Sequence, residues 1–485
     1  MKKNIILFII LFSLGIIVTY PSFASSHALD SYCTIYNGYN DTAIWFLQNG
    51  RIFSALLFWF YGLVNFPFDS MRFLSSFFAN AFLAISILCL YNKMNTNLKD
   101  NKVIKGILFV SLFLVFYNPL FTEVLILDET CVIALGLLLL TLASIKIYEG
   151  GICNYFLALV LAILGITCYQ GIGGYLIVIP LMLFITDRDN NIKDIVKRFV
   201  ISILIYGISF ILNFGIIKLV SNIVSKNMPK LGHFDIVGNI SLIINDLFPN
   251  SVHYLFGFVN INIYYAFVFI LFVLCVYLII KNDNKKNTTF LLILAVLSCL
   301  FVPFIPNVFM DSNSSYTAAR MALTIMAVPS ILVIYIISLA DGMKLGYVLL
   351  GITILLFSFY AYSIHQNTMI NFKRFKEDVK YINNISDHIK WYEHENKIKV
   401  KTIYYAKDTA VDYYYSFGNA NGANIRLLAV DWGLECAFPV YTENKYKIKK
   451  MSKVDYEKYF ADKNYNKFSS KELKFVDDKL YLLLY

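Results

Sequence analysis

Long apolar segments constrain this sequence more than any other feature. A helix of roughly 17–25 apolar residues crosses a bilayer core about 30 Å thick, and the chain of 485 residues has many segments near this length. Hydrophobic residues make up 58% of the chain and charged residues 15%, against about 45–50% and about 25% in soluble domains. This composition excludes an ordinary cytosolic enzyme and a disordered chain. It predicts a polytopic α-helical membrane protein.

We expect about 11 transmembrane helices, within a range of nine to twelve. The segments are Asn4–Tyr20, Phe73–Tyr91, Ile107–Phe121, Cys131–Tyr148, Tyr155–Cys168, Ile172–Ile185, Phe199–Val220, Ile263–Ile280, Thr289–Pro306, Met321–Ala340 and Leu345–Ser363. Ile52–Phe66 is apolar but too short to cross, so we expect it to lie along the interface or to re-enter the membrane. The first segment also resembles a signal peptide. The poor cleavage site after Tyr20-Pro21 favours an uncleaved span.

Positive charges give the expected orientation. With Lys2 and Lys3 in the cytoplasm, the loops that return to that side carry most of the lysine and arginine residues. The opposite short loops carry acids instead, which agrees with the positive-inside rule. After 11 spans the C-terminus lies outside. The formal net charge of +10 does not predict nucleic-acid binding, because the basic residues are spread over loops and a tail rather than over one face.

The composition changes after about residue 364. We expect a transmembrane domain at residues 1–364, with a first outer loop at about 21–72, and a second domain at 365–485. The second domain holds half of the 42 lysine and arginine residues. It begins with a helical stripe of apolar residues and continues with strand-like runs at Val400–Ala406, Ile425–Val430 and Leu480–Tyr485. This pattern predicts a small α/β domain on the outer face of the membrane.

The cysteines and histidines show no metal-binding or redox pattern. Six of the eight cysteines lie in or beside apolar runs, where cysteine behaves as a small hydrophobic residue. Only Cys33 and Cys436 fall in polar segments, and we interpret Cys436 as a lone thiol used in packing or substrate contact. The six histidines lack the spacing of metal ligands.

The first outer loop contains Asp30, Asp41 and Arg51 within about twenty residues. Sugar transfer from a lipid phosphate to a hydroxyl group requires a carboxylate that takes the hydroxyl proton. It also requires cations that hold the departing phosphate, as the planar guanidinium group does. We therefore name Asp30 and Asp41 as candidate catalytic acids and Arg51 as a candidate phosphate ligand. From position alone, solvated acids and an interfacial arginine are the simpler interpretation.

Three further acids lie at the expected outer ends of the third and fourth spans: Glu123, Asp128 and Glu129. Carboxylates there can bind a sugar or a metal ion, and they can equally be outward-facing acids with no other role. We name Glu123 and Asp128 as candidate sugar-binding residues. No cofactor is certain; a divalent metal is compatible with these acids, but no metal site is assigned.

Tyr169 and Gln170 precede a glycine-rich break in a long apolar stretch, CYQGIGG. An amide beside such a break can hydrogen-bond a sugar hydroxyl, although a tight outer turn explains the break without further function. Arg320 follows the loop DSNSSYTAA. It is a candidate phosphate ligand, or an anchor for the start of the tenth span.

Taken together, these features resemble the type II serotype-converting O-antigen glucosyltransferases of enteric bacteria and their temperate phages. The matching positions are Asp30, the Asn49-Gly50-Arg51 element and the Tyr169-Gln170 pair. Family members often have two adjacent acids at the start of the loop, whereas Leu29 precedes Asp30 here. Either Asp30 suffices or Asp41 supplies the second carboxylate.

The resemblance implies a fold similar to the C-type (GT-C) lipid-phosphate-sugar glycosyltransferases in the bacterial inner membrane, with the active site and the C-terminal domain in the periplasm. It implies that the enzyme moves glucose from undecaprenyl-phosphate glucose to a sugar of the lipid-linked O-antigen, which converts the lipopolysaccharide serotype. It also implies two functional partners, a glucosyl-lipid synthase and a flippase.

Two other classes of protein fit parts of the sequence. A transporter or flippase for a lipid-linked sugar would place ionisable residues inside its spans and would show two related halves. Here the spans hold almost no charges and the acids cluster at one face. A membrane scaffold that binds through its tail fits the composition, but it leaves the acidic first loop unexplained. We therefore favour the enzyme.

Overall fold

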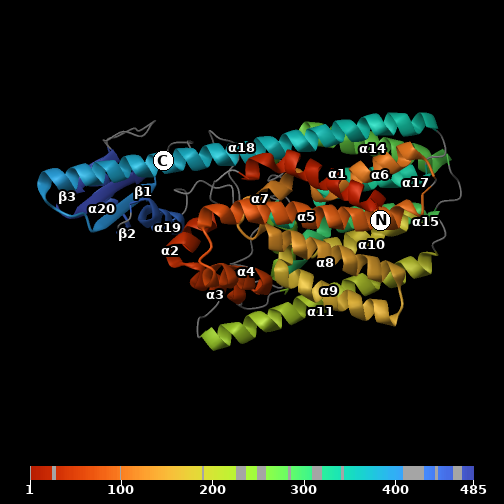
Figure 1. Cartoon of the computed structure of the whole chain (residues 1–485), viewed down its shortest axis with the longest axis horizontal. Coiled ribbons are helices and arrows are strands. Elements are labelled where there is room, and N and C mark those ends of the chain that lie inside the picture. The colour runs from red at the N-terminus through yellow and green to blue at the C-terminus, as the bar shows by residue number, and fades with distance from the viewer. Residues whose placement is uncertain are drawn as a thin grey trace.

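The structure is a computed structural model of the 485-residue chain. It describes residues 2–23, 29–98, 100–187, 191–224, 236–247, 258–281, 286–308, 319–339, 343–407, 431–442, 446–461 and 472–484. Most helices run side by side along the longest axis and form a bundle, and a small β-sheet lies beyond one end of it (Figure 1). We call the end of the bundle nearer the sheet the outer end.

Eight helices in the described part of the chain are long and apolar enough to cross a membrane. They are α1 (Lys2–Thr19), α5 (Phe68–Asn95), α6 (Lys102–Phe116), α8 (Thr130–Glu149), α11 (Ile192–Val224), α14 (Ile261–Lys281), α15 (Lys286–Phe301) and α18 (Met343–Asn396). Short helical elements continue α6 as far as Leu125 and α15 as far as Val308, which gives these two spans their length. The protein is therefore a polytopic helical membrane protein, as predicted. The three other predicted spans fall on the shorter helices α9 (Ile152–Cys168), α10 (Tyr175–Thr186) and α17 (Val328–Leu339).

Helices α10 and α17 form the centre of the bundle. All 12 residues of each helix are buried, as expected for helices that are apolar on every side. The surrounding helices α1, α11, α14 and α15 instead expose many isoleucine, leucine and phenylalanine side chains. An apolar outer surface of this kind suits contact with lipid rather than with water.

The first outer loop is largely helical. It contains α2 (Leu29–Asn37), α3 (Tyr39–Gln48) and α4 (Ile52–Leu63) at the outer end of the bundle (Figure 1). Helices α3 and α4 pack as a hairpin around Phe46, Phe58 and Tyr61. The hairpin exposes Trp45 and Trp59, and its turn contains Arg51.

Several short elements complete the polypeptide path. They are η1 (Tyr20–Phe23), η2 (Pro119–Phe121), α7 (Thr122–Leu125), η3 (Gln170–Ile172), α12 (Ile236–Leu242), η5 (Ile243–Leu247), η6 (Val302–Phe304), α16 (Ile305–Val308), η8 (Ala319–Met321) and η9 (Ile325–Ala327). The elements η2, η3 and α7 each contact η8. This brings polar residues from distant parts of the sequence together.

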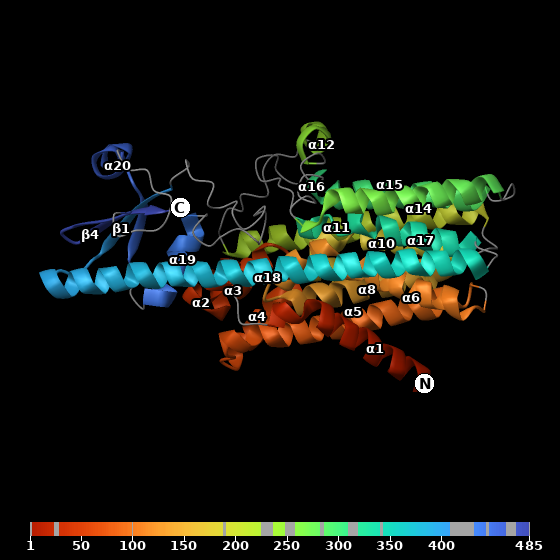
Figure 2. The same cartoon turned by 90° about the horizontal axis from the view of Figure 1, so that it is seen from above.

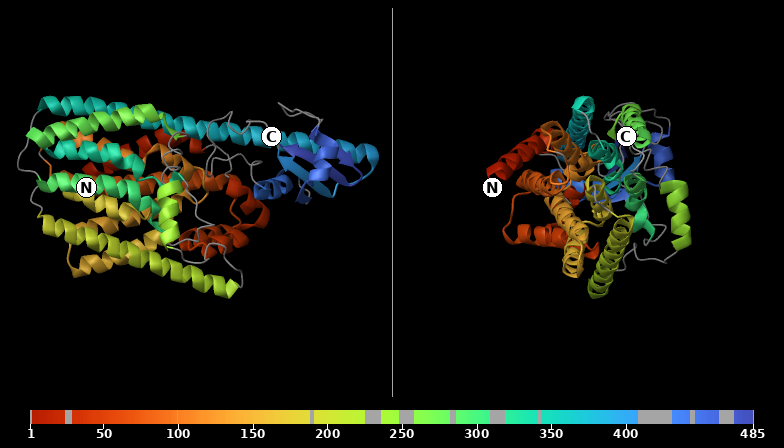
Figure 3. Two further views of the ribbon diagram at one scale, coloured as in Figure 1. Left: turned by 180° about the vertical axis from the view of Figure 1, so that it is seen from behind. Right: turned by 90° about the vertical axis from the view of Figure 1, so that its right-hand side faces the viewer.

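Helix α18 is 54 residues long and runs from the far end of the bundle to the sheet (Figure 2). Around its end fold β1 (Thr402–Lys407), α19 (Asp431–Thr442), β2 (Lys447–Lys450), α20 (Lys453–Phe460), β3 (Leu473–Val476) and β4 (Lys479–Leu484). The strand order is β2-β1-β4-β3. Strand β1 is parallel to β2 and β4, and β3 is antiparallel to β4. We call residues 397–484, where described, the sheet region; it lies apart from the bundle in the view from behind as well (Figure 3).

Alternating side chains on the strands give the sheet two packed faces. Ile403 and Leu482 pack in a core with α18 and α19, whereas Tyr404 and Tyr481 stack with ring centroids 5.2 Å apart on the face covered by α20. Strands β1 and β4 lie where the sequence predicts two of its strands. The third predicted strand, Ile425–Val430, lies outside the described residues.

A disulfide joins Cys33 of α2 to Cys436 of α19. The prediction that Cys436 is a lone thiol is therefore wrong. It was wrong because the two cysteines are 403 residues apart in the sequence, and sequence spacing does not show which distant cysteines meet in space. The other six cysteines are free.

Candidate functional site

The three acids in and just after α7 are buried at the outer end of the bundle. Glu123, Asp128 and Glu129 expose 0%, 6% and 4% of their surfaces. Buried carboxylates require charged or hydrogen-bonding partners, because desolvation without compensation costs several kcal/mol. Arginine residues from other elements meet this requirement.

Arg320 of η8 pairs with Glu123. Its Nη1 atom donates to Glu123 Oε1 at 2.9 Å, and its backbone N–H donates to Glu123 Oε2 at 2.6 Å. Both carboxylate oxygens therefore contact the same residue. The two contacts fix the backbone of η8 as well as the guanidinium group.

Arg51, at the start of α4, pairs with Glu129. Its Nη1 atom donates to Glu129 Oε1 at 3.2 Å. Its guanidinium carbon also lies 5.9 Å from the centre of the Trp45 ring and 4.7 Å from that of Tyr169. Arg51 Nε is buried and has no hydrogen-bond partner among the described residues, so the guanidinium group keeps a donor for a further acceptor.

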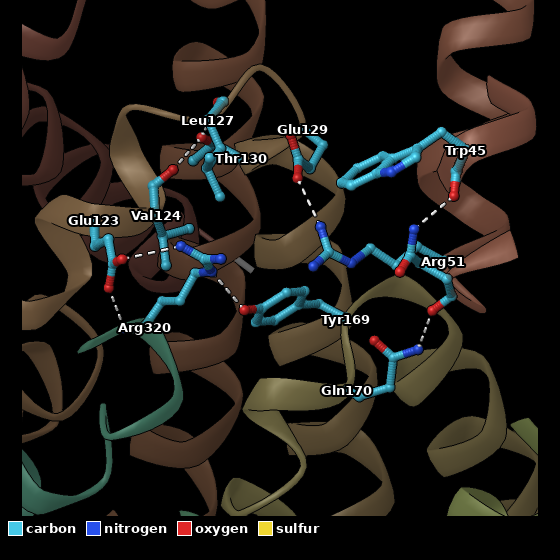
Figure 4. A network of polar contacts seen from close by, with 11 residues as sticks. Trp45, Arg51, Glu123, Val124, Leu127, Glu129, Thr130, Tyr169, Gln170 and Arg320 are labelled. Carbon is cyan, nitrogen blue, oxygen red and sulfur yellow. Dashed lines mark hydrogen bonds and ion pairs between the residues drawn. The ribbon is translucent and has the colours of Figure 1, made fainter. Parts of the chain in front are cut away.

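Tyr169 lies between the two arginines (Figure 4). Its ring faces the guanidinium group of Arg51, while its hydroxyl oxygen accepts a hydrogen bond from Arg320 Nε at 2.7 Å. A cation against an aromatic face contributes about 0.5–2 kcal/mol. One side chain thus organises two cations that lie 269 positions apart in the sequence.

A second set of contacts holds the turn before Arg51. Gln170 Nε2 donates to the Asn49 carbonyl oxygen at 2.7 Å and to Asn213 Oδ1 at 3.0 Å. Asn213 Nδ2, on α11, donates to the Gly50 carbonyl oxygen at 2.8 Å. Gly50 has φ +71°, and a Cβ atom there would lie 2.7 Å from Asn213 Oδ1. The turn therefore needs glycine for both conformation and space.

The third acid, Asp128, faces two other elements. Its carboxylate interacts electrostatically with Arg72 of α5, which is 3% exposed and donates from Nε to the Ser22 carbonyl oxygen at 3.1 Å. Burial, and then the charge of Asp128, raise the pKa of Tyr39 to about 12. Asp128 thus helps to join α5 to the α3–α4 hairpin.

The structure brings together Arg51, Glu123, Tyr169, Gln170 and Arg320 from the predicted site. Asp30 lies in the first turn of α2, and its side chain is not among those that the structure describes. Asp41 is exposed in the first turn of α3. It therefore lies at the opposite end of this helix from the turn that contains Arg51, about 10 Å of helix rise from Gln48.

Two residues at the site were missed by the sequence analysis, Arg72 and Asn213, and Glu129 was noted among the outer acids but not named as a site residue. The sequence feature that could have identified them is a polar side chain inside or next to an apolar span, because such a side chain is costly in a membrane unless it has a partner. Among the described residues, no group of three or more histidine, cysteine, aspartate or glutamate side chains is placed to hold a metal ion.

The fold and the site define first a class: a polytopic helical membrane protein with a buried arginine–carboxylate site at one end of its bundle. Residues 19–337 match the family model described as Glucosyl transferase GtrII. The chain therefore belongs to the type II glucosyltransferase family that the sequence resembles, and it is a glycosyltransferase. Comparison with the curated proteins gives no match.

Proposed function

We propose that the protein transfers glucose from undecaprenyl-phosphate glucose to a sugar of the lipid-linked O-antigen. The observation that carries this proposal is the pair of guanidinium groups on either side of Tyr169. Arginine binds phosphate through its planar fork, and the leaving group of this reaction is a lipid phosphate. The family match supports the transfer of glucose, and the arginine pair supports a donor in which the glucose is linked to phosphate.

The proposed mechanism is a single displacement. The acceptor hydroxyl oxygen attacks the anomeric carbon of glucose, and the bond from that carbon to the phosphate oxygen breaks. The bonding electrons stay on the phosphate, whose growing charge Arg51 and Arg320 stabilise. Asp30 takes the hydroxyl proton. Such electrostatic and acid–base contributions are each about 10²–10⁴-fold in rate.

The glutamates prepare the arginines for this step. Glu123 and Glu129 compensate the two cations before the donor binds, so that neither guanidinium group is buried alone. Arg51 Nε, which has no hydrogen-bond partner among the described residues, then provides a donor for the phosphate. Tyr169, Gln170, Glu123 and Asp128 would contact the sugar. Gln170 also holds the turn before Arg51.

We infer that the outer end of the bundle faces the periplasm. The disulfide between α2 and α19 requires an oxidising compartment such as the periplasm. The connections at the other end lie beside lysines of α5, α6, α8, α11 and α14, as the positive-inside rule predicts for the cytoplasmic side. If α9, α10 and α17 also cross the membrane, the eight long helices bring the total to the predicted 11 spans, and such a path would put the sheet region on the same side as α2.

The α3–α4 hairpin supports a lipid-linked donor. Trp45 and Trp59 are 44% and 53% exposed, and Leu56 and Leu63 are 51% and 62% exposed. Tryptophan at the membrane interface has a polar edge and an apolar body. The hairpin would lie in the outer leaflet, beside the polyprenyl chain, with Arg51 at its turn near the headgroup.

The flippase alternative is less consistent with the site. A transporter needs ionisable groups along a path through the membrane. Here the arginine–carboxylate pairs gather at one end of the bundle, and the family match indicates a transferase.

Mass spectrometry of lipopolysaccharide tests the proposal. Cells that contain the glucosyl-lipid synthase and flippase are compared with and without the protein. We expect a gain of one hexose per O-antigen repeat, and we expect D30N to abolish it while the protein still inserts. No mass change in the presence of donor lipid would contradict the proposed reaction, and full activity of D30N at normal expression would remove Asp30 from it.

A further inference from the structure

Helix α2 belongs to the hydrophobic core of the sheet region, although it lies in the first outer loop. Tyr32 is 1% exposed and packs in the same cluster as Ile385 of α18, Phe438 of α19 and Leu482 of β4. The packing is between segments about 400 residues apart in the chain. The sheet region therefore does not complete its core without α2.

Two direct bonds reinforce this packing. The disulfide connects Cys33 to Cys436, and the hydroxyl groups of Tyr32 and Tyr441 are hydrogen-bonded at 2.6 Å. Burial, and then the nearby Tyr441 and Asp378, raise the pKa of Tyr32. The phenol is therefore neutral at physiological pH, as this hydrogen bond between two hydroxyl groups requires.

The same loop is held at its other end by the bundle. From α2 the chain passes through Gly38 into α3 and reaches Arg51, which Glu129 holds directly. Gln170 and Asn213 hold the turn before it. The loop thus has two anchors, one in the bundle at Arg51 and one in the sheet region at Tyr32 and Cys33.

We propose that the Cys33–Cys436 disulfide and the Tyr32–Tyr441 hydrogen bond are positioning elements of the active site. They hold α2, and with it Asp30, in a fixed place relative to the phosphate-binding arginines. This inference rests on the proposed function for the role of Asp30. It gives the sheet region a part in the chemical step in addition to any contact with the acceptor.

The chemistry explains why such positioning matters. A general base acts only within hydrogen-bond reach of the proton that it takes, and a displacement of about 1 Å can lower the rate about 10²-fold. Arg320 is held by Glu123 and Tyr169 of the bundle. Arg51 belongs to the loop, but Glu129 and the ring of Tyr169 hold its guanidinium group directly. Loss of the disulfide should therefore impair the chemical step and leave donor binding intact.

The test uses the full-length protein in lipid nanodiscs. The donor is undecaprenyl-phosphate glucose with radiolabelled glucose, and the acceptor is the lipid-linked O-antigen fraction of the host cell. The variant C33S/C436S is compared with the wild type, and C153S is the matched control, because Cys153 is a free, exposed cysteine at the start of α9. The kcat, the KM for the donor and donor binding are measured for each.

We expect kcat of C33S/C436S to fall about 10²-fold, with the KM for the donor and donor binding within twofold of wild type. C153S should match the wild type. Wild-type protein reduced in the nanodisc should lose activity to a similar extent and should regain it on reoxidation, which the double variant cannot do. This arm tests the proposal even if C33S/C436S fails to fold during synthesis.

Two results would overturn the inference. One is an unchanged kcat after reduction of the disulfide, and the other is a loss of donor binding equal to the loss of kcat, which would indicate a general structural role. In both cases wild-type transfer would stand. A wild-type protein that binds acceptor and donor but transfers no glucose would instead contradict the proposed function itself.

Discussion

Arg51 shows how one residue combines several constraints. Its guanidinium group donates to Glu129, lies against the ring of Tyr169 and keeps Nε for a further acceptor. A lysine retains the positive charge but has neither the planar face nor the fork. The shape of the group, and not its charge alone, is therefore required at this position.

For this reason we expect R51K to lower the transfer rate about 10²-fold, close to the effect of R51A, while the protein accumulates normally. The measurement is radiolabelled glucose transfer in membranes with equal amounts of each variant. Lys93, at the other end of the bundle, offers a matched control through K93R. Near-normal transfer by R51K would show that charge alone suffices.

The buried pair of Glu123 and Arg320 gives a second prediction at this scale. E123A removes a fully buried carboxylate and leaves the arginine, whose side chain is 11% exposed, without its ion pair. Breaking a buried pair in this way costs about 3–5 kcal/mol. We expect a clear fall in the thermal unfolding temperature in detergent. E123L/R320M, which removes both charges, should recover most of the stability but no activity. If E123A unfolds at the wild-type temperature, the pair does not stabilise the fold.

Sequence reasoning at this scale identified the residue types but not their partners. The sequence indicates Arg51 and Arg320 as cations beside outer loops. It indicates Glu123 as an acid at the outer end of a span and Tyr169 as a polar residue at a glycine-rich break. The pairing of Glu129 with Arg51 and the role of Asn213 depend on how α8 and α11 pack. No spacing in the sequence encodes those distances.

Helix α1 is joined to the bundle by a buried polar network. Asn80 Nδ2 donates to Thr19 Oγ1 at 3.2 Å, and the Tyr117 hydroxyl donates to Asn80 Oδ1 at 2.8 Å. A Cβ atom on Gly15 would lie 2.3 Å from the Tyr117 hydroxyl oxygen. The close approach of α1 to α5 and α6 thus depends on glycine at this position.

We therefore expect G15L to separate α1 from the network and to destabilise the protein by at least the 1–3 kcal/mol typical of overpacking. I9L is the control, because Ile9 is 54% exposed on the same helix. The measurement is the thermal unfolding temperature of each purified variant. Equal unfolding temperatures would mean that α1 is not held by this contact.

Apolar length predicted the elements of the bundle well, since each predicted span lies on a helix. Helices α2 and α3 were not predicted, because polar residues interrupt their apolar pattern and their burial comes from distant segments. The strands β1 and β4 were recognisable from short apolar runs. The joining of α2 to the sheet region was not, because it is a contact between the two ends of the chain.

The shared core of α2 and the sheet region predicts which segments can be exchanged with those of another family member without loss of activity. Replacing residues 375–485, which include the part of α18 in this core, by those of another family member leaves α2 against a foreign α18 and α19. We expect such a chimaera to be inactive, and a chimaera that also exchanges residues 29–37 to regain transfer. The measurement is lipopolysaccharide mass with matched protein amounts. Equal activity of both chimaeras would contradict a shared core.

The disulfide also sets an order of events during biogenesis. Its cysteines are 403 residues apart, so at synthesis rates of about 5–20 residues per second Cys436 follows Cys33 by about 20–80 seconds. Throughout that time Cys33 must wait as a thiol while the rest of the chain is made and inserted. A ribosome that stops before Cys436 therefore leaves a protein that contains Arg51 and Arg320 but in which α2 is not joined to α19. Completion of the last tenth of the chain is what closes the first outer loop.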